Sequence, residues 1–241
     1  MWPRAGDSTR SAGPSFCLGR TTLKREAVKV APMADVPISE LNSRATLMKL
    51  LDEFGEHPET LAEVTRRIRD VFEQERAILI LDMSGFTRAT RQGNIISFLL
   101  SINQMQRLAV PVVEERGGIL VKAEHDNLTC LFDRVEEAID ASRDVTERLE
   151  SANVILPSDK ELYAAIGIGF GSILNVENHD IYGNEVNLAS KLGEDIGDLG
   201  DVLLTSNAYE QIADQDIKCE ERKVSVSGLE FNYYALLGDN R

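Results

Sequence analysis

Short apolar runs alternate along this chain with longer segments whose apolar residues recur every three or four positions. The first kind is typical of buried strands and the second of amphipathic helices. The predicted order is strand, helix, hairpin, helix and strand, over residues 78–81, 94–116, 119–123 with 128–132, 134–149 and 162–170. This order indicates an α/β fold, an α+β sandwich of ferredoxin-like type.

A further helix is predicted to begin at Asn184, because Gly183 and Asn184 are typical of a turn and a helix N-cap. Its apolar residues fall on one arc, which comprises Val186, Leu188, Ala189, Leu192, Gly193 and Ile196. Asn187 and Lys191 are four residues apart and therefore lie together on the opposite face. Strands over 202–204, 217–226 and 231–237 complete the predicted sheet.

The chain before this sandwich divides into two parts. Residues 33–75 are predicted to be helical, with an apolar stripe along 61–72 that indicates either packing within the chain or a short parallel coiled coil. Residues 1–32 carry six Arg or Lys against two acids, a net charge of +4. Their composition is typical of disorder or of a transit peptide, and Met33 offers an alternative start. We favour a basic extension that is disordered or absent from the native protein.

The composition narrows the classes of partner. With a net charge of -14 and a pI of about 4.7, the 241-residue chain is not expected to bind nucleic acid or an anionic membrane. We find no apolar run near the roughly twenty residues of a membrane span. Three scattered cysteines, Cys17, Cys130 and Cys219, indicate neither a disulfide framework nor a zinc site. We therefore expect a cytoplasmic protein without a membrane span.

Two acidic residues stand where a predicted strand ends or turns. Asp82 follows the strand 78–81 and precedes a turn that contains Gly85. This arrangement suits metal and phosphate binding, because backbone N–H groups in such a turn can face an anion. Asp126 lies in the predicted tight turn of the hairpin. An isolated turn aspartate is usually structural, but together these two carboxylates can converge on a pair of divalent ions.

Three motifs follow one another in a distinctive order. They are Asp82-x-x-Gly-Phe-Thr, then Gly117-Gly118 followed by Lys122-x-x-x-Asp126, then Asp180-Ile-Tyr-Gly-Asn-x-Val-Asn-x-Ala-Ser-Lys191. Their order and spacing resemble the catalytic domain of the class III nucleotidyl cyclases, over about residues 76–237. The resemblance implies a ferredoxin-like nucleotidyl cyclase fold for residues 76–241, with an N-terminal helical extension before it.

The resemblance implies a metal and phosphate half of an active site. Asp82, Asp126 and the Met83 carbonyl would hold two Mg²⁺ or Mn²⁺ ions per site. Backbone N–H groups of the next three residues would bind the β- and γ-phosphates of the substrate. Those residues are Gly85, Phe86 and Thr87.

The resemblance also implies a purine and transition-state half. Lys122 and Asp180 match the family's purine-reading pair in its adenine-selecting form, since a lysine can donate to adenine N1 and an aspartate can accept from the exocyclic amine. Asn187 would orient the ribose, and Lys191 would stabilise charge developing on the α-phosphate. In this family the two halves face each other across a dimer interface, so a head-to-tail homodimer with two equivalent sites is implied.

Two residues depart from the family pattern within these motifs. Lys191 stands where the family usually has Arg, and His125 replaces the hairpin glycine before Asp126. We interpret the chain as an adenylate cyclase that converts ATP to 3′,5′-cyclic AMP and pyrophosphate. The alternative is a cyclase homology domain of low activity that binds nucleotide or protein partners as a regulatory module.

Overall fold

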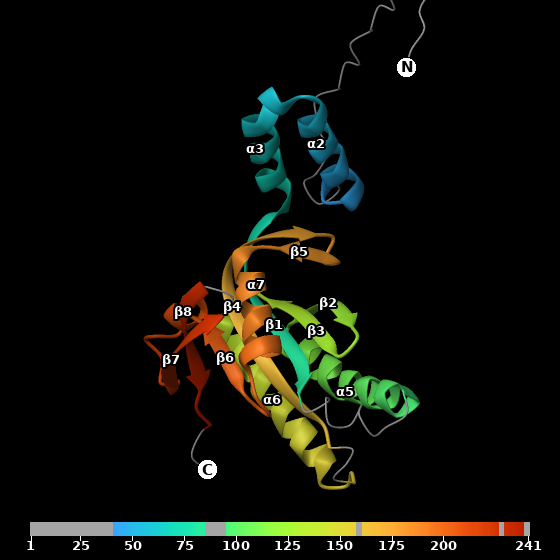
Figure 1. The fold of residues 1–241 in the computed structure, drawn as a ribbon, viewed down its shortest axis with the longest axis vertical. Coiled ribbons are helices and arrows are strands. Elements are labelled where there is room, and N and C mark those ends of the chain that lie inside the picture. The colour runs from blue at the N-terminus through green and yellow to red at the C-terminus, as the bar shows by residue number, and fades with distance from the viewer. Residues whose placement is uncertain (1–40, 85–94, 158–160, 227–228, 239–241) are drawn as a thin grey trace, which may run out of the picture. The chain divides into compact units, whose positions relative to one another are not determined.

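The computed structural model describes residues 41–84, 95–157, 161–226 and 229–238 (Figure 1). Residues 37–241 form one compact unit, and the predicted basic extension over 1–32 lies outside the described residues. The helices are α2 (Arg44–Glu56), η1 (Pro58–Thr60), α3 (Leu61–Phe72), α5 (Ile95–Glu115), α6 (Val135–Asn153), α7 (Asn184–Ser190), η2 (Lys191–Ile196) and α8 (Ser206–Glu210). The strands are β1 (Glu73–Ser84), β2 (Ile119–Glu124), β3 (Asn127–Phe132), β4 (Tyr163–Val176), β5 (Asp180–Tyr182), β6 (Val202–Thr205), β7 (Cys219–Val226) and β8 (Leu229–Leu236).

These strands form one sheet. Their order in the described part of the chain is β2-β3-β1-β4-β6-β8-β7, and β5 pairs with β4 beside this path. β1 is antiparallel to both of its neighbours, β3 and β4. The crossover from β4 through α7 reaches β6, which runs parallel to β4. The predicted ferredoxin-like sandwich is therefore confirmed, whereas β5 was not predicted.

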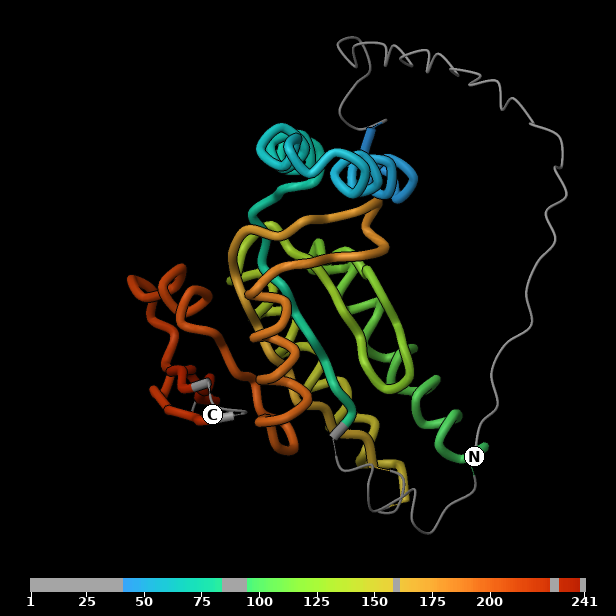
Figure 2. Tube along the Cα trace, turned by 45° about the horizontal axis from the view of Figure 1, so that its top comes forward, coloured from blue at the N-terminus to red at the C-terminus, as the bar shows by residue number. Residues whose placement is uncertain are grey.

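The two faces of the sheet follow from the period-two alternation along β1. Leu79 and Leu81 pack into the core with α5 and α6, whereas Ile78 and Ile80 pack with Ala189 of α7. Figure 2 shows α7 on one side of these strands and the paired helices α5 and α6 on the other. By the same alternation, Asp82 lies on the α7 face.

Glycines bring α7 unusually close to the sheet. A Cβ on Gly167 of β4 would lie 2.0 Å from the Ala189 carbonyl oxygen, and one on Gly193 would lie 3.0 Å from the Ile80 carbonyl oxygen. Backbone therefore meets backbone at these points, and a side chain would have no room. The Gly-x-Gly-x-Gly run at 167–171 thus serves close packing.

The N-terminal helices form a hairpin with its own small core. Val64, Val71 and Phe72 of α3 are buried against Leu47 and Leu50 of α2. This cluster reaches the sheet through Val176 at the end of β4. Of the two interpretations of the α3 stripe, packing within the chain is therefore the one that the structure supports.

Helix α5 bears on the expectation that no segment is long and apolar enough to span a membrane. It runs without a break through Pro111, and by length and composition alone it is the one described helix that could cross a membrane. Such a test is also passed by core helices of other proteins, and Met105, Ala109 and Val112 of α5 are buried in the main core. Gly117, with a φ of 82°, ends the helix as predicted.

Candidate active site on the α7 face

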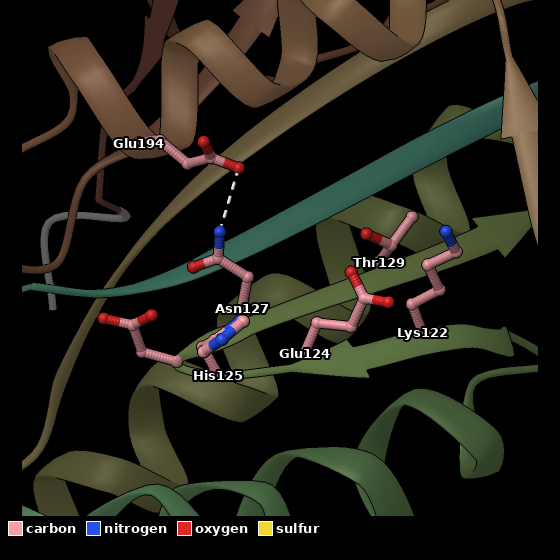
Figure 3. A pocket seen from close by; sticks show the side chains of 7 residues that line it. Lys122, Glu124, His125, Asn127, Thr129 and Glu194 are labelled. Carbon is pink, nitrogen blue, oxygen red and sulfur yellow. Dashed lines mark hydrogen bonds between the residues drawn. The ribbon is translucent and has the colours of Figure 1, made fainter.

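The register of the central strands gathers polar side chains on one face. Asp82 of β1 lies opposite Asn127 of β3, and Ile80 lies opposite Thr129. Thr129 in turn lies opposite Lys122 of β2. Residues directly opposite in an antiparallel pair share a face, so these side chains all lie on the α7 face. Lys122, Asn127 and Thr129 border a cavity of about 230 Å³, which is also lined by Glu124, His125, Asp126 and Glu194 (Figure 3).

Three carboxylates interact electrostatically at one end of this face. The Met83 backbone N–H donates to the Asp126 carbonyl at 3.2 Å, which holds the hairpin turn against the end of β1. Burial of the Asp82 carboxyl, with repulsion from Asp126 and Glu194, raises its pKa to about 7. A carboxyl that is half-charged near neutral pH beside two other acids is a place where a bound cation would relieve repulsion.

The donors at this place fit a small divalent ion. Within the described residues, His, Cys, Asp and Glu side chains alone form no group of three or more that could hold a metal. Other oxygen atoms must therefore complete the set. The predicted oxygen donors are the carboxylates of Asp82 and Asp126 and the carbonyl of Met83. Beside them, the Asn127 side-chain oxygen is buried and accepts no hydrogen bond from the described residues. Mg²⁺ and Mn²⁺ prefer such oxygen ligands, so this set fits either ion.

Lys122 lies beside a β-bulge in β2. The pairing of β2 with β3 shifts by one residue between Leu120 and Lys122. Val121 packs into the cluster beneath α7, and Lys122, the next residue, lies opposite Thr129 and lines the cavity on the same face. Two successive residues can share a face only where the ladder is interrupted in this way. The bulge therefore places the apolar Val121 beside the Lys122 ammonium on the α7 face.

The two predicted purine-reading residues meet in the structure. The Lys122 Nζ lies 2.6 Å from Asp180 Oδ1, where β5 begins. This hydrogen bond raises the pKa of Lys122 and lowers the pKa of Asp180. At neutral pH the pair is therefore a fixed donor beside a fixed acceptor.

The hairpin turn shows what the His125 departure means. His125 has a φ of 54°, and it is the first central residue of the turn between β2 and β3. A positive φ at that position is typical of a type II′ turn, which favours Gly. His125 therefore adopts a backbone conformation that suits glycine, at some cost in strain.

Helix α7 carries the predicted transition-state residues. It begins at Asn184 as predicted, although the N-cap is Gly183 and makes no side-chain hydrogen bond. Asn187 is exposed and Lys191 is half-buried. At Lys191 the helix widens into the π-turn η2, a feature that is frequent at functional sites.

A short hydrogen-bond chain joins this helix to the hairpin. Glu194 of η2 accepts from the Asn127 amide at 2.9 Å and from the Ser190 hydroxyl at 2.8 Å. Figure 3 shows the Asn127 amide directed towards Glu194. The segment that holds Asp126 and the segment that holds Lys191 are thus connected within one chain.

The sequence did not reveal the buried anchor of α7. Glu185 is a charged residue outside the predicted apolar arc of the helix, yet it is buried. Its carboxylate accepts from Thr205 Oγ1 at 2.7 Å and from the Asn207 amide at 2.9 Å. Its room comes from Gly169 and Gly171, where a Cβ would lie 3.3 Å and 3.0 Å from Glu185 side-chain atoms. The paired glycines of β4 were the signal in the sequence that could have indicated a buried side chain at the start of α7.

The predicted phosphate-binding residues Gly85, Phe86 and Thr87 lie outside the described residues. Of the remaining predicted residues, Asn187 lies in α7 and Lys191 begins η2, and the others form two groups. The acidic group lies at the end of β1 and at the hairpin turn, and the Lys122–Asp180 pair lies where β2 meets β5.

Comparison with known proteins bears on the whole arrangement. No model of a protein family matches the chain. Over 136 residues, which are 56% of this chain and 23% of the relative, it is 25% identical to "Putative adenylate cyclase 3" of Rhizobium meliloti (strain 1021). The chain thus spans about a quarter of that protein's length.

Solved structures with the same fold cover most of the described chain. An adenylate/guanylate cyclase/hydrolase from Silicibacter pomeroyi superposes with a TM-score of 0.61 at 23% identity, over 69% of this chain and 98% of that one. The adenylyl cyclase CyaB from P. aeruginosa gives 0.56 at 21% identity, over 70% and 97%. The guanylyl cyclase Cya2 gives 0.59 at 20% identity, over 69% and 93%. Both adenylyl and guanylyl cyclases are among these neighbours, so the fold alone does not select a purine.

Proposed function

From a chain that has the fold of the class III nucleotidyl cyclase catalytic domain, we propose an adenylate cyclase that converts ATP to 3′,5′-cyclic AMP and pyrophosphate at the interface of a homodimer. One observation carries the choice of reaction and substrate: the Lys122–Asp180 pair lies on the same face of the sheet as the acidic group around Asp82. A cytoplasmic location is part of the proposal.

Purine selection follows from the paired charges. The Lys122 ammonium donates to adenine N1, and Asp180 accepts from the exocyclic amine. Guanine presents the opposite pattern at these positions, with a donor at N1 and an acceptor at O6. A site with buried or paired polar groups rejects the wrong pattern because those groups would lose their partners.

The acidic group serves the reacting end of the substrate. Asp82, Asp126 and the Met83 carbonyl would hold two Mg²⁺ or Mn²⁺ ions, which when bound favour the deprotonated ribose 3′-hydroxyl and neutralise the triphosphate. The 3′-oxygen then bonds to the α-phosphorus, the bond from that phosphorus to the bridging oxygen breaks, and pyrophosphate leaves. Asn187 and Lys191 of the partner subunit complete the site: Asn187 orients the ribose, and Lys191 stabilises the charge that develops on the α-phosphate.

The test is a cyclase assay with the purified full chain. We expect cyclic AMP from ATP with Mn²⁺, less cyclic product from GTP, and loss of product in Asp82→Ala and Asp126→Ala. The surface change Glu210→Ala is the matched acidic control, since Glu210 is exposed at the end of α8. Product that survives both aspartate changes would show that these residues do not hold the ions.

Two observations favour the regulatory alternative. Lys191 offers a single ammonium instead of the two-pronged guanidinium of an arginine, and His125 holds a strained conformation next to Asp126. A domain that binds ATP but yields no cyclic AMP, with binding abolished by Asp180→Ala, would be the regulatory nucleotide-binding module.

A further inference from the structure

The turn that leads into Asp180 has an unusual backbone. Glu177 and Asn178, between β4 and β5, have φ values of 55° and 54°. Two successive residues in the left-handed region are costly for side chains other than Gly. Asn175, which is buried, offsets part of this cost, because its side chain accepts from the Asn178 N–H at 3.1 Å and donates to Asn178 Oδ1 at 2.7 Å.

A second support for this turn comes from far away in the sequence. The Asn42 side chain donates to the Asn175 carbonyl at 3.0 Å and accepts from the Glu177 N–H at 3.0 Å. The backbone N–H of Arg44, at the start of α2, donates to Glu177 Oε2 at 3.0 Å. Residues 42–44, at the start of α2, therefore hold the turn at three points, two of them on its backbone.

The same segment reaches the purine-reading carboxylate itself. Arg44 Nη1 lies 3.6 Å from Asp180 Oδ2, while Lys122 holds the other oxygen, Oδ1, at 2.6 Å. The Asp180 side chain is 22% exposed and that of Arg44 is 76% exposed. Asp180 is thus held between two cations from different parts of the chain, and its pKa lies below the ordinary value through Lys122 first and Arg44 after it.

Two cations on one carboxylate have a consequence for recognition. They favour the ionised form, which only accepts hydrogen bonds. An ionised Asp180 in a fixed orientation suits an exocyclic amine and repels the O6 carbonyl of guanine. Loosening of the turn or loss of the second cation would let the carboxylate rotate away from the exocyclic amine, and the discrimination between adenine and guanine would fall.

We propose that Asn42 and Arg44 are positioning residues for Asp180. Through them, residues 42–44 at the start of α2 set the preference of the site for adenine over guanine nucleotides. This inference rests on the purine-reading role of Asp180 in the proposed function. It predicts that specificity is determined partly by residues that do not touch the nucleotide.

Binding rather than turnover is the suitable readout. The full chain is titrated in a calorimeter with the α,β-methylene analogues of ATP and GTP in Mn²⁺, since these analogues cannot release pyrophosphate. The measured quantity is the ratio of the two dissociation constants. A change that merely weakens the fold lowers binding of both analogues and leaves the ratio unchanged.

We expect Arg44→Ala to reduce the preference for the adenine analogue about threefold, the size of effect that an exposed ion pair contributes. Asn42→Ala removes two hydrogen bonds to the turn and is expected to reduce the preference about tenfold. Arg44→Lys should retain most of the preference. Lys49→Ala is the matched control, because Lys49 is an exposed cation on the same helix.

The outcomes separate this inference from the proposed function. Asp180→Ala should abolish the preference; if it does not, the purine-reading role fails. If Asp180→Ala abolishes the preference but Arg44→Ala and Asn42→Ala match Lys49→Ala, then the inference fails and the proposed function stands. Should Asn42→Ala prove unfolded by circular dichroism, the ratio for Arg44→Ala compared with Arg44→Lys decides alone.

Discussion

Lys191 places one ammonium where an arginine would offer two parallel donors to a phosphate. Its role was inferred from a motif, and the structure adds that it is half-buried at the point where α7 widens into η2. The place of this proposed phosphate contact therefore depends on the geometry of the π-turn as well as on the side chain.

Arg at position 191 should therefore accelerate the reaction. We expect Lys191→Arg to raise kcat for ATP up to about tenfold, equivalent to about 1.4 kcal/mol of barrier, because the guanidinium holds two phosphate oxygens at once. The measurement is the rate of cyclic AMP formation at saturating ATP with Mn²⁺. Lys49→Arg on α2 is the control, and equal rates for the two variants would place residue 191 away from the phosphate.

Asp82 gives a pH dependence whose sign can be worked out. Its pKa rises from 3.8 to about 7 in the fold, so the metal-free fold binds this proton more tightly than the unfolded chain does. The contribution is complete below about pH 4 and is lost as the pH rises through 7. With chelator present, we expect wild type to lose on the order of 2 kcal/mol more stability than Asp82→Asn between pH 5 and pH 8.

Urea unfolding at the two pH values measures this difference. Added Mn²⁺ should stabilise wild type more at pH 8 than at pH 5, because the proton then no longer competes for the carboxylate. Parallel pH profiles of wild type and Asp82→Asn would mean that the Asp82 carboxyl is charged throughout.

At the scale of the elements, the close contact of α7 with β4 determines where Asn187 and Lys191 lie. Gly167 allows the contact at the Ala189 carbonyl, and the buried Glu185 carboxylate fixes the start of the helix. Both features lie on the side of α7 that packs on the sheet, opposite to Asn187 and Lys191. They nevertheless determine the position of the helix over the sheet.

Gly167→Ala should displace this helix. Its new Cβ would meet the Ala189 carbonyl oxygen at 2.0 Å, and we expect a loss of about 3 kcal/mol in the free energy of unfolding, as for other overpacked sites. Gly55→Ala in α2 is the matched control, since nothing lies within 4 Å of its added Cβ, and it should stabilise by about 0.5 kcal/mol. Urea unfolding compares the two, and equal stabilities would mean that α7 is not held by this contact.

Periodicity accounts for which elements could be predicted. The hairpin of β2 and β3, the start of α7 at Asn184 and the order of the strands each depend on several residues in sequence, and the structure confirms them. The strand β5 has only three residues, too few for an alternation to show. Hydropathy also cannot identify a charged residue that turns inward, which is why Glu185 was missed.

Contacts over long separations were equally out of reach. Asn42 bonds to Asn175, which is 133 residues further along the chain, and no local pattern links them. The motifs named the candidate site residues, whereas their relative placement could not be predicted. Lys122 contacts Asp180 because the three-residue strand β5, which showed no pattern in the sequence, lies beside β2.

At the scale of the whole molecule, the proposed dimer divides each active site between two chains. Within one chain, the acidic group belongs to one site, and Asn187 with Lys191 belongs to the other. Two chains damaged in different halves can then form one intact site between them.

Mixing Asp82→Ala with Asn187→Ala chains should restore activity. Equal amounts that exchange at random give half heterodimers, each with one intact site of two, so about a quarter of the wild-type rate is expected. The rate of cyclic AMP formation measures this after the two inactive proteins have been mixed. Asp82→Ala mixed with Asp126→Ala is the control, because every site then lacks an acidic ligand; no recovery in the first mixture would place both halves in one chain.

The extra residue in β2 makes nucleotide recognition depend on how many residues the strand contains. Loss of the Ala123 codon would restore an even ladder with β3, place the lysine opposite Leu128 and turn it to the α5 side of the sheet. A substitution of the exposed Ile119 would leave the count, and therefore the direction of the lysine, unchanged. In a genetic screen for cyclic nucleotide signalling, we accordingly expect deletion of this one codon to behave as a null allele where missense alleles at Ile119 are silent.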